Sequence, residues 1–301
     1  MNLHSFETYL NDRNRAPNTV RGYMQSLARF ITWYKITNNV PSVAAADVGT
    51  ADINAYRLHL RDKLQLMPNA INSNLSALRE WGKWAVAQRM ITTNPARHAD
   101  NIPEQAHGPK WLTEPNERAI LRAAEKCIQT AGRNPRHQFT ARRNYALVLV
   151  ALRTGLRVAE LCALRRADVA VKDRVAHVTI RLGKGGKKRV VPLGGEGLQI
   201  WNEWEKWRTD RGDINPLAFP NDDGKPLTGS GVARMCKRLA ALANVPFTPH
   251  HLRHTFAHNL VDRGIDITRV QALMGHTNAN TTARYVKPSV EELASVVEVL
   301  G

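Results

Sequence analysis

The chain reads TPHHLRHTFAH over residues 248–258 and LMGHTNANTTARY over residues 273–285. The first string sets His250 and Arg253 one helical turn apart, and the second ends at Tyr285. An arginine stays charged at any working pH and can hold a phosphate oxygen with its planar fork. A histidine can move a proton near neutral pH, and a tyrosine hydroxyl can be a covalent nucleophile when its neighbours activate it. The stretch therefore carries the residue types that phosphoryl transfer requires.

The charge of the chain indicates a polyanionic partner. Lys and Arg number 43 against 26 Asp and Glu, which gives a formal charge of +17, and the pI is near 10.3. A surplus of this size repels itself in the folded state, and nucleic acid is the polyanion that most often balances it. The alternative is a generic basic surface. Basic residues exceed acidic ones in both halves of the chain, so we expect both halves to contact double-stranded DNA.

Length and cysteine content narrow the class further. A chain of 301 residues is longer than one average domain and suits two. The three cysteines are odd in number and have no C-x-x-C spacing, which disfavours a disulfide framework or a zinc site and fits a reducing cytosol. No apolar run approaches the ~18 residues that span a bilayer, and no signal pattern opens the chain. We therefore expect a cytoplasmic protein with no membrane partner.

Residues 1–95 are predicted to be entirely helical. Apolar side chains recur at spacings of three and four in four segments. The second segment opens at a cap over Asn18-Thr19, and the third covers about residues 50–64. The fourth begins at Met67-Pro68 and ends at Asn94-Pro95. Basic residues between these stripes favour phosphate contacts over solubility alone. The DNA-binding candidates in this domain are Arg21, Arg57, Arg79 and Lys83.

A second domain is predicted over residues 110–301, after a linker at 96–109 that lacks periodicity. Alternation over residues 174–182 and the return over 187–193 predict a small antiparallel hairpin with a glycine-rich turn. The other segments read as helices, among them 116–130, 141–153 and 228–244. The fold class is therefore mainly α, with an α+β second domain. Arg234 and Lys237 in the last of these helices are further DNA-binding candidates.

Two more basic candidates precede the opening stretch. In the string TGLRVAEL, at residues 154–161, Gly155 permits a tight turn and Arg157 starts a helix. Taken alone, Arg157 is equally well explained by an ion pair with Glu160. Lys184 at the hairpin tip can reach into a groove, although a solvated loop lysine is the more usual reading. Lys187 is a DNA-binding candidate and also the alternative to Lys184.

Taken together, these strings resemble the tyrosine recombinases of the phage integrase family. H-x-x-R, L-M-G-H and T-T-x-x-Y occur in the family's order and spacing, and T-G-L-R-x-x-E-L matches its first active-site arginine. The resemblance implies a simple, Xer-type form with a helical, SAM-like core-binding domain and a catalytic domain. It places the catalytic lysine in G-K-G-x-K. The implied catalytic set is Arg157, Lys184, His250, Arg253, His276 and Tyr285.

The implied chemistry uses no cofactor and no metal. His250, His254 and His258 recur every four residues, but no glutamate stands where a zinc protease needs one. Asp262 and Asp266 form no carboxylate cluster for magnesium. Fixed arginines, Lys184 and histidines would neutralise the phosphate instead. The resemblance implies a 3′-phosphotyrosyl link, a Holliday junction, and integration, excision or resolution of DNA from a mobile element.

The tail indicates a protein contact. Residues 289–301 contain three glutamates, no Lys or Arg and an apolar stripe, so they suit a protein surface, either their own domain's or a neighbour's, better than DNA. The family passes this exchange helix to the next subunit of a ring of four, which implies a homo-tetramer on DNA, with accessory proteins setting direction. Two alternatives remain: a type IB topoisomerase-like enzyme that relaxes DNA, and a non-catalytic DNA-binding regulator of the same fold.

Overall fold

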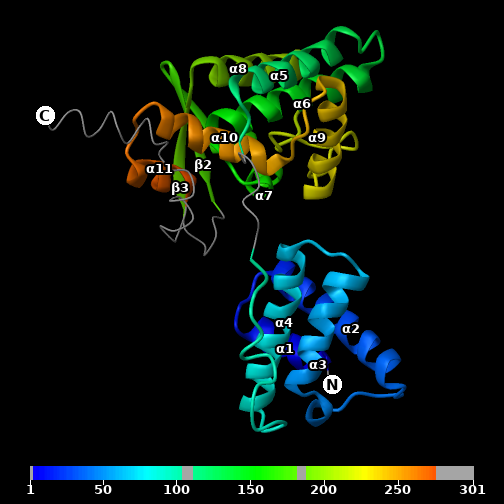
Figure 1. The fold of residues 1–301 in the computed structure, drawn as a ribbon. Coiled ribbons are helices and arrows are strands. Elements are labelled where there is room, and N and C mark those ends of the chain that lie inside the picture. The colour runs from blue at the N-terminus through cyan, green and yellow to red at the C-terminus, as the bar shows by residue number, and fades with distance from the viewer. Residues whose placement is uncertain (1–2, 104–110, 182–187, 276–301) are drawn as a thin grey trace, which may run out of the picture. The chain divides into compact units, whose positions relative to one another are not determined.

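The computed structural model describes residues 3–103, 111–181 and 188–275. The chain divides into two compact units, residues 1–106 and 107–301, each with its own hydrophobic core. Both units are mainly helical, and the second holds a small antiparallel sheet (Figure 1). This confirms the predicted fold class. None of the helices in the described ranges is long and apolar enough to cross a membrane.

The first unit packs its helices around aromatic side chains. Phe30 and Tyr56 meet edge to face with ring centroids 5.1 Å apart, and Trp81 is also buried. Such pairs add specific geometry to the burial of apolar area. The elements are α1 (Leu3–Asp12), α2 (Pro17–Asn38), the 3₁₀ turn η1 (Ala45–Asp47), α3 (Thr50–Leu58), the π-helical turn η2 (His59–Lys63) and α4 (Pro68–Ala87).

Two predicted boundaries in this unit were wrong. Helix α2 begins at Pro17 rather than after a cap at Asn18-Thr19, because proline at the first helical position presets the backbone and lacks only an N–H that has no partner there. The third helix covers the predicted residues, although its backbone changes to π spacing at His59. The fourth ends at Ala87, and Arg89 has a left-handed backbone with φ of 55°, so the chain leaves the helix well before Pro95.

Residues 94–102, which include the start of the predicted linker, are attached to α4. The side-chain amide of Asn72 donates to Ile102 O at 2.9 Å, and Ile102 N donates back to Asn72 Oδ1 at 2.8 Å. Arg79 Nη2 donates to Asn101 Oδ1 at 2.5 Å, and Asn94 Nδ2 donates to Arg79 O at 3.0 Å. The Asn72 bonds satisfy the backbone N–H and C=O of Ile102 in a segment with no regular structure, and the four bonds together attach this segment to the first unit.

The second unit is built around α6. Its residues 147–152 are all buried, since α5, α8 and α10 pack against it. An uninterrupted apolar run is expected of a helix covered on every side. The helical elements are α5 (Glu114–Gln129), α6 (Pro135–Thr154), α7 (Val158–Ala163), η3 (Arg166–Asp168), α8 (Gly195–Thr209), α9 (Gly229–Ala243), α10 (Pro249–Asp262) and α11 (Ile267–Met274).

The sheet has three strands in the order β1-β2-β3. The predicted hairpin forms from β2 (Val175–Ile180) and β3 (Arg189–Gly194), paired antiparallel with Ile180 opposite Arg189. A further strand, β1 (Val169–Lys172), pairs with β2 and was missed because four mostly exposed residues leave little alternation to detect. In Figure 1, α11 lies beside β3, so the end of the hairpin is close to the end of α11.

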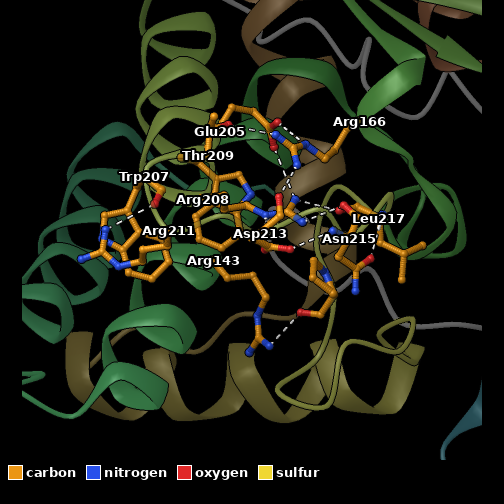
Figure 2. A network of polar contacts seen from close by, with 12 residues as sticks. Arg143, Arg166, Glu205, Trp207, Arg208, Thr209, Arg211, Asp213, Asn215 and Leu217 are labelled. Carbon is orange, nitrogen blue, oxygen red and sulfur yellow. Dashed lines mark hydrogen bonds and ion pairs between the residues drawn. The ribbon is translucent and has the colours of Figure 1, made fainter.

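A fully buried arginine holds the irregular segment that follows α8. Arg208 Nε donates to Asp213 Oδ2 at 2.7 Å, and its terminal nitrogens donate to Leu217 O at 2.7 Å and Asn215 O at 2.9 Å. Figure 2 shows this guanidinium surrounded by the acceptors of residues 205–217. A buried charge persists only when it is paired and hydrogen-bonded, so Arg208 determines the path of the segment.

Replacing Arg208 with Met is expected to destabilise the second unit strongly. The change leaves the Asp213 carboxylate and two carbonyls without their donor, and breaking a buried pair costs roughly 3–5 kcal/mol of unfolding free energy. The melting temperature should fall by on the order of 10 °C, as measured by circular dichroism. Lys206→Met, on the same helix but in an exposed pair with Asp210, should shift it by about 2 °C or less.

Candidate functional site: two arginines at the end of a helix

Helix α10 begins with an imidazole used as a cap. Thr248 stands at the N-cap and Pro249 at the first helical position. His251 Nδ1 accepts a hydrogen bond from Thr248 N at 3.2 Å and lies 2.8 Å from Thr248 Oγ1. Burial, and then the charge of His250, lower the pKa of His251. His251 is therefore neutral and engaged in capping, which favours His250 over His251 as the proton carrier.

Arg253 lies one turn further along α10, with its side chain directed into the protein. It is 5% exposed. Its Nη1 donates to Gly155 O, and its Nη2 donates to Met274 O at 2.6 Å. The buried neighbours Leu252 and Phe256 anchor this part of α10. Since both terminal nitrogens bond to backbone, the guanidinium plane has a fixed orientation.

Arg157 approaches the same place from the start of α7. Its backbone N donates to Glu160 Oε2 at 2.8 Å and its Nη1 to Glu160 Oε1 at 3.0 Å, while its Nη2 donates to Gly275 O at 2.9 Å. The ion pair considered from the sequence is therefore present. The same contacts direct Arg157 to the C-terminal end of α11, where Arg253 also bonds. The side chain of Arg157 is 27% exposed, so it remains accessible to a ligand.

Gly155 allows the two arginines to come this close. Its backbone has φ of 60°, and an added Cβ would lie 2.3 Å from Phe256 Cδ1 and 3.0 Å from Met274 Sδ. Only glycine combines this left-handed backbone with so close an approach. The Gly155 carbonyl accepts from Arg253, and Arg157 follows two residues later, so the turn links both guanidinium groups.

Three imidazoles follow one face of α10. The rings of His250 and His254 stack with centroids 5.4 Å apart, and the ring of His258 stacks on Trp111 at 4.2 Å. Next to Trp111, the backbone N of Leu112 donates to Thr255 Oγ1 at 2.9 Å. The helix that carries His250 and Arg253 is thus fastened to the first described residues of the second unit.

The structure places some of the predicted residues and not others. Arg157 and Arg253 come together at α11, and His250 lies on the same helix as Arg253. Lys184, Lys187, His276 and Tyr285 lie outside the described residues. Within the described ranges, no group of three or more His, Cys, Asp or Glu side chains has an arrangement that could hold a metal ion.

The predicted DNA-binding residues also differ in their surroundings. Those with exposed side chains are Arg21, Lys83, Arg234 and Lys237. Arg79 is half-buried and bonds to Asn101, and Arg57 Nη1 donates to Asp100 O at 3.4 Å. Both therefore help to hold the segment attached to α4, a role that the sequence pattern did not reveal.

The sequence analysis did not single out Arg189. It considered Glu160 only as the partner of Arg157 in a simple ion pair. Both Glu160 oxygens receive hydrogen bonds from Arg189 at 2.8 Å. Burial alone would raise the pKa of Glu160, but the hydrogen bonds and charges of Arg189 and Arg157 outweigh it and hold the pKa below its ordinary value. The only sequence signal for Arg189 was its position as a charged residue at the start of an apolar strand. Such a position is typical of a solvated strand end.

Two arginines held in fixed orientations beside a histidine, in a chain of net positive charge, suit an enzyme that acts on the phosphates of nucleic acid. The chain belongs to the phage integrase family, whose model matches residues 110–292, and residues 3–91 match the family's N-terminal SAM-like domain. It is a tyrosine recombinase, an enzyme of site-specific DNA recombination. This confirms the resemblance, the enzyme class and the general function expected from the sequence.

Curated relatives match over almost the whole chain. The chain is 30% identical to tyrosine recombinase XerC of Shewanella sp. (strain MR-4), over 98% of this chain and 93% of the relative. It is 29% identical to tyrosine recombinase XerA of Thermococcus kodakarensis, over 98% and 94%. These relatives are Xer recombinases, which agrees with the predicted resemblance to the Xer type.

Solved structures share the fold. The Tn1549 transposon integrase in complex with transposon right end DNA aligns with a TM-score of 0.76 at 23% identity, covering 100% of this chain and 99% of that one. The XerH site-specific recombinase bound to its difH substrate aligns with a TM-score of 0.72 at 19% identity, covering 99% and 84%. At these identities the likeness concerns the fold alone.

Proposed function

We propose that the chain cuts and rejoins DNA with Tyr285 as the nucleophile, Arg157 and Arg253 as the phosphate-holding cations, and His250, Lys184 and His276 as the supporting groups. The observation that carries the proposal is the meeting of Arg157 and Arg253 at the end of α11. The sequence continues from that helix end directly to His276 and then to Tyr285.

The proposed reaction conserves the phosphoester. The Tyr285 oxygen attacks the scissile phosphorus, and the bond to the 5′-oxygen of the next nucleotide breaks. His250 takes the phenolic proton, Lys184 gives a proton to the leaving oxygen, and His276 donates a hydrogen bond to a phosphate oxygen. The products are a 3′-phosphotyrosyl link and a free 5′-hydroxyl. Attack by a 5′-hydroxyl of another strand reverses these steps, so no nucleotide hydrolysis is needed.

The geometry suits charge that develops in the transition state. Charge spreads over the non-bridging oxygens as the phosphorus becomes five-coordinate, and donors that are already oriented stabilise it without reorganising. Arg253 is oriented by two backbone carbonyls, and Arg157 by Glu160 and Gly275. Lys187 is the alternative to Lys184 as the residue that gives a proton to the leaving oxygen.

Binding to the duplex is assigned to exposed basic residues of both units. Arg21 and Lys83 in the first unit, with Arg234 and Lys237 in the second, carry exposed side chains and suit sequence-independent phosphate contacts. For Arg57 and Arg79 we propose a dual role, since each also bonds to the segment at residues 94–101. The domain limits proposed are 1–95 for the DNA-binding helices, to which residues 96–102 are attached, and 110–301 for the catalytic domain.

The assembly is proposed to be a homo-tetramer on DNA in the cytoplasm, with residues 289–301 reaching a neighbouring subunit and accessory proteins setting direction. The acidic, apolar composition of this tail supports the protein contact. The natural outcome, whether integration, excision or resolution, depends on where the sites lie.

The test first captures the DNA substrate. The purified chain is incubated with sheared DNA from its source organism, denatured, and the covalently attached fragments are sequenced. Two copies of the recovered sequence are then placed on one plasmid. We expect deletion or inversion between the copies. Relaxation of the plasmid without rearrangement would instead support a type IB topoisomerase, and binding without covalent fragments would support a non-catalytic regulator.

A further inference from the structure

Three arginine side chains converge on the C-terminal end of α11. Arg189 Nε donates to Leu273 O at 3.1 Å, Arg253 Nη2 to Met274 O at 2.6 Å, and Arg157 Nη2 to Gly275 O at 2.9 Å. The last carbonyls of a helix have no partner within the helix and form the negative end of its dipole. The three cations therefore replace the missing donors and fix where α11 ends.

Glu160 joins two of these arginines. Arg189 binds it with two parallel bonds of 2.8 Å, one to each carboxylate oxygen, and Arg157 adds a backbone and a side-chain bond. The Glu160 side chain is 4% exposed and that of Arg189 is 13% exposed. Paired, buried and bidentate bonds of this kind are both strong and selective for one orientation. The carboxylate that orients Arg157 is therefore held in turn by Arg189.

The charges leave room for an anion. Three guanidinium groups and one carboxylate among the described residues carry two positive charges in excess. Arg189 has all three of its nitrogens engaged, with Glu160 and with Leu273 O. It is also half as exposed as Arg157, at 13% against 27%. The excess charge is thus available to a phosphate through Arg157, whereas Arg189 is less exposed and is bonded to Glu160 and Leu273 O.

The backbone of α11 lies directly against Arg189. A Cβ added to Gly275 would be 3.0 Å from Arg189 Nη1 and 3.1 Å from its Cδ and Cζ, and Gly275 has φ of 61°. Gly275 immediately precedes His276 in the chain. Arg189 also begins β3 opposite Ile180, so this pair is the last before the connecting segment of the hairpin, which contains Lys184 in sequence. One side chain therefore links the helix of Arg157, the hairpin of Lys184 and the helix that precedes His276.

We propose that Arg189 is a positioning residue for DNA strand cleavage, which acts by holding Glu160 and the end of α11 so that Arg157 meets the scissile phosphate. The inference rests on the proposed function. Arg189 itself makes no contact with the phosphate. Its loss lets Arg157 rotate away and lets α11 shift, and misplacing a group by about 1 Å can cost about 100-fold in rate.

The test uses Arg189→Lys in the full chain on the recovered duplex site. Lysine keeps the charge but not the planar fork. At saturating DNA we expect formation of the covalent adduct to slow about 100-fold, with DNA affinity changed less than about threefold. Arg166→Lys is the matched control, because Arg166 also forms a part-buried pair with a glutamate, Glu205, away from the α11 end. It should leave the rate unchanged.

A neutral substrate separates positioning from general loss of structure. A methylphosphonate at the scissile position carries no negative charge, so its transition state depends less on stabilisation by Arg157. The rate penalty of Arg189→Lys, relative to the wild type on the same substrate, should then shrink about tenfold or more. An equal penalty on both substrates would overturn the inference, as would a cleavage rate that Arg189→Lys leaves unchanged.

A double-mutant cycle tests whether Arg189 acts through Glu160. In Glu160→Gln, the further change Arg189→Lys should slow cleavage by less than about threefold, since residues that act as one unit are not additive. Full additivity would contradict the inference. If the wild type itself forms no adduct, the proposed function fails. If the wild type cleaves and the Arg189 results are negative, only the positioning role fails.

Discussion

Replacing Tyr285 with Phe is expected to abolish covalent attachment to DNA and leave DNA affinity within about twofold. The change removes one oxygen, the atom proposed to attack the phosphorus, and keeps the ring. Removing a member of a nucleophilic set lowers rates by about 10⁴-fold or more, which lies below the detection limit of a denaturing gel. Adduct formation on the recovered site and a mobility shift are the two measurements.

Tyr23→Phe is a suitable control for this prediction, because it makes the same chemical change in the first unit, on α2. It should cleave at the wild-type rate. An adduct that survives in Tyr285→Phe at more than about one thousandth of the wild-type rate would refute the assignment of the nucleophile.

Replacing Arg253 with Lys is expected to slow cleavage by about 10³-fold. Lysine presents one point charge in place of a fork held by Gly155 O and Met274 O, and losing one oriented donor to a developing oxyanion costs about 10²–10³-fold. The helix end at Met274 also loses its donor, so the melting temperature should fall by a few degrees. Single-turnover cleavage and thermal melting measure the two effects.

Arg143→Lys is the matched control for Arg253→Lys. Arg143 is also a buried arginine of the second unit, 6% exposed, and it donates to Pro220 O and Asp222 Oδ1, both at 3.0 Å. The two variants should lose similar stability, while only Arg253→Lys loses cleavage. Equal losses of cleavage would mean that Arg253 acts through stability alone.

Periodicity was enough to predict most of the fold. The apolar run in α6, the stripes of α2 and α4 and the β2–β3 hairpin appear where the sequence places them, because burial of apolar side chains dominates those choices. The errors fall where polar contacts decide. The attachment of residues 94–102 to α4 depends on Asn72, Arg79 and Asn94, and no hydrophobic pattern encodes such bonds.

The site shows the same division. The resemblance carried by local strings predicted Arg157, Arg253 and His250 as site residues, and the structure brings the two arginines together at the end of α11. Arg189 lies far from those strings in sequence and becomes visible only when β3, α7 and α11 come together. Likewise, Glu160 was seen as a partner of Arg157, but its second partner required the fold. Three-dimensional convergence of single charged residues leaves no local signature.

Locating the attached DNA within the protein is the most direct test of the proposed chemistry, in which a tyrosine takes a strand end and side-chain cations serve in place of a metal. The adduct is formed in excess EDTA, digested with protease and nuclease, and analysed by mass spectrometry. We predict a nucleotide on the peptide that contains Tyr285, with the same yield as without chelator. A nucleotide on another residue, or a yield that falls in EDTA, would contradict the proposed mechanism.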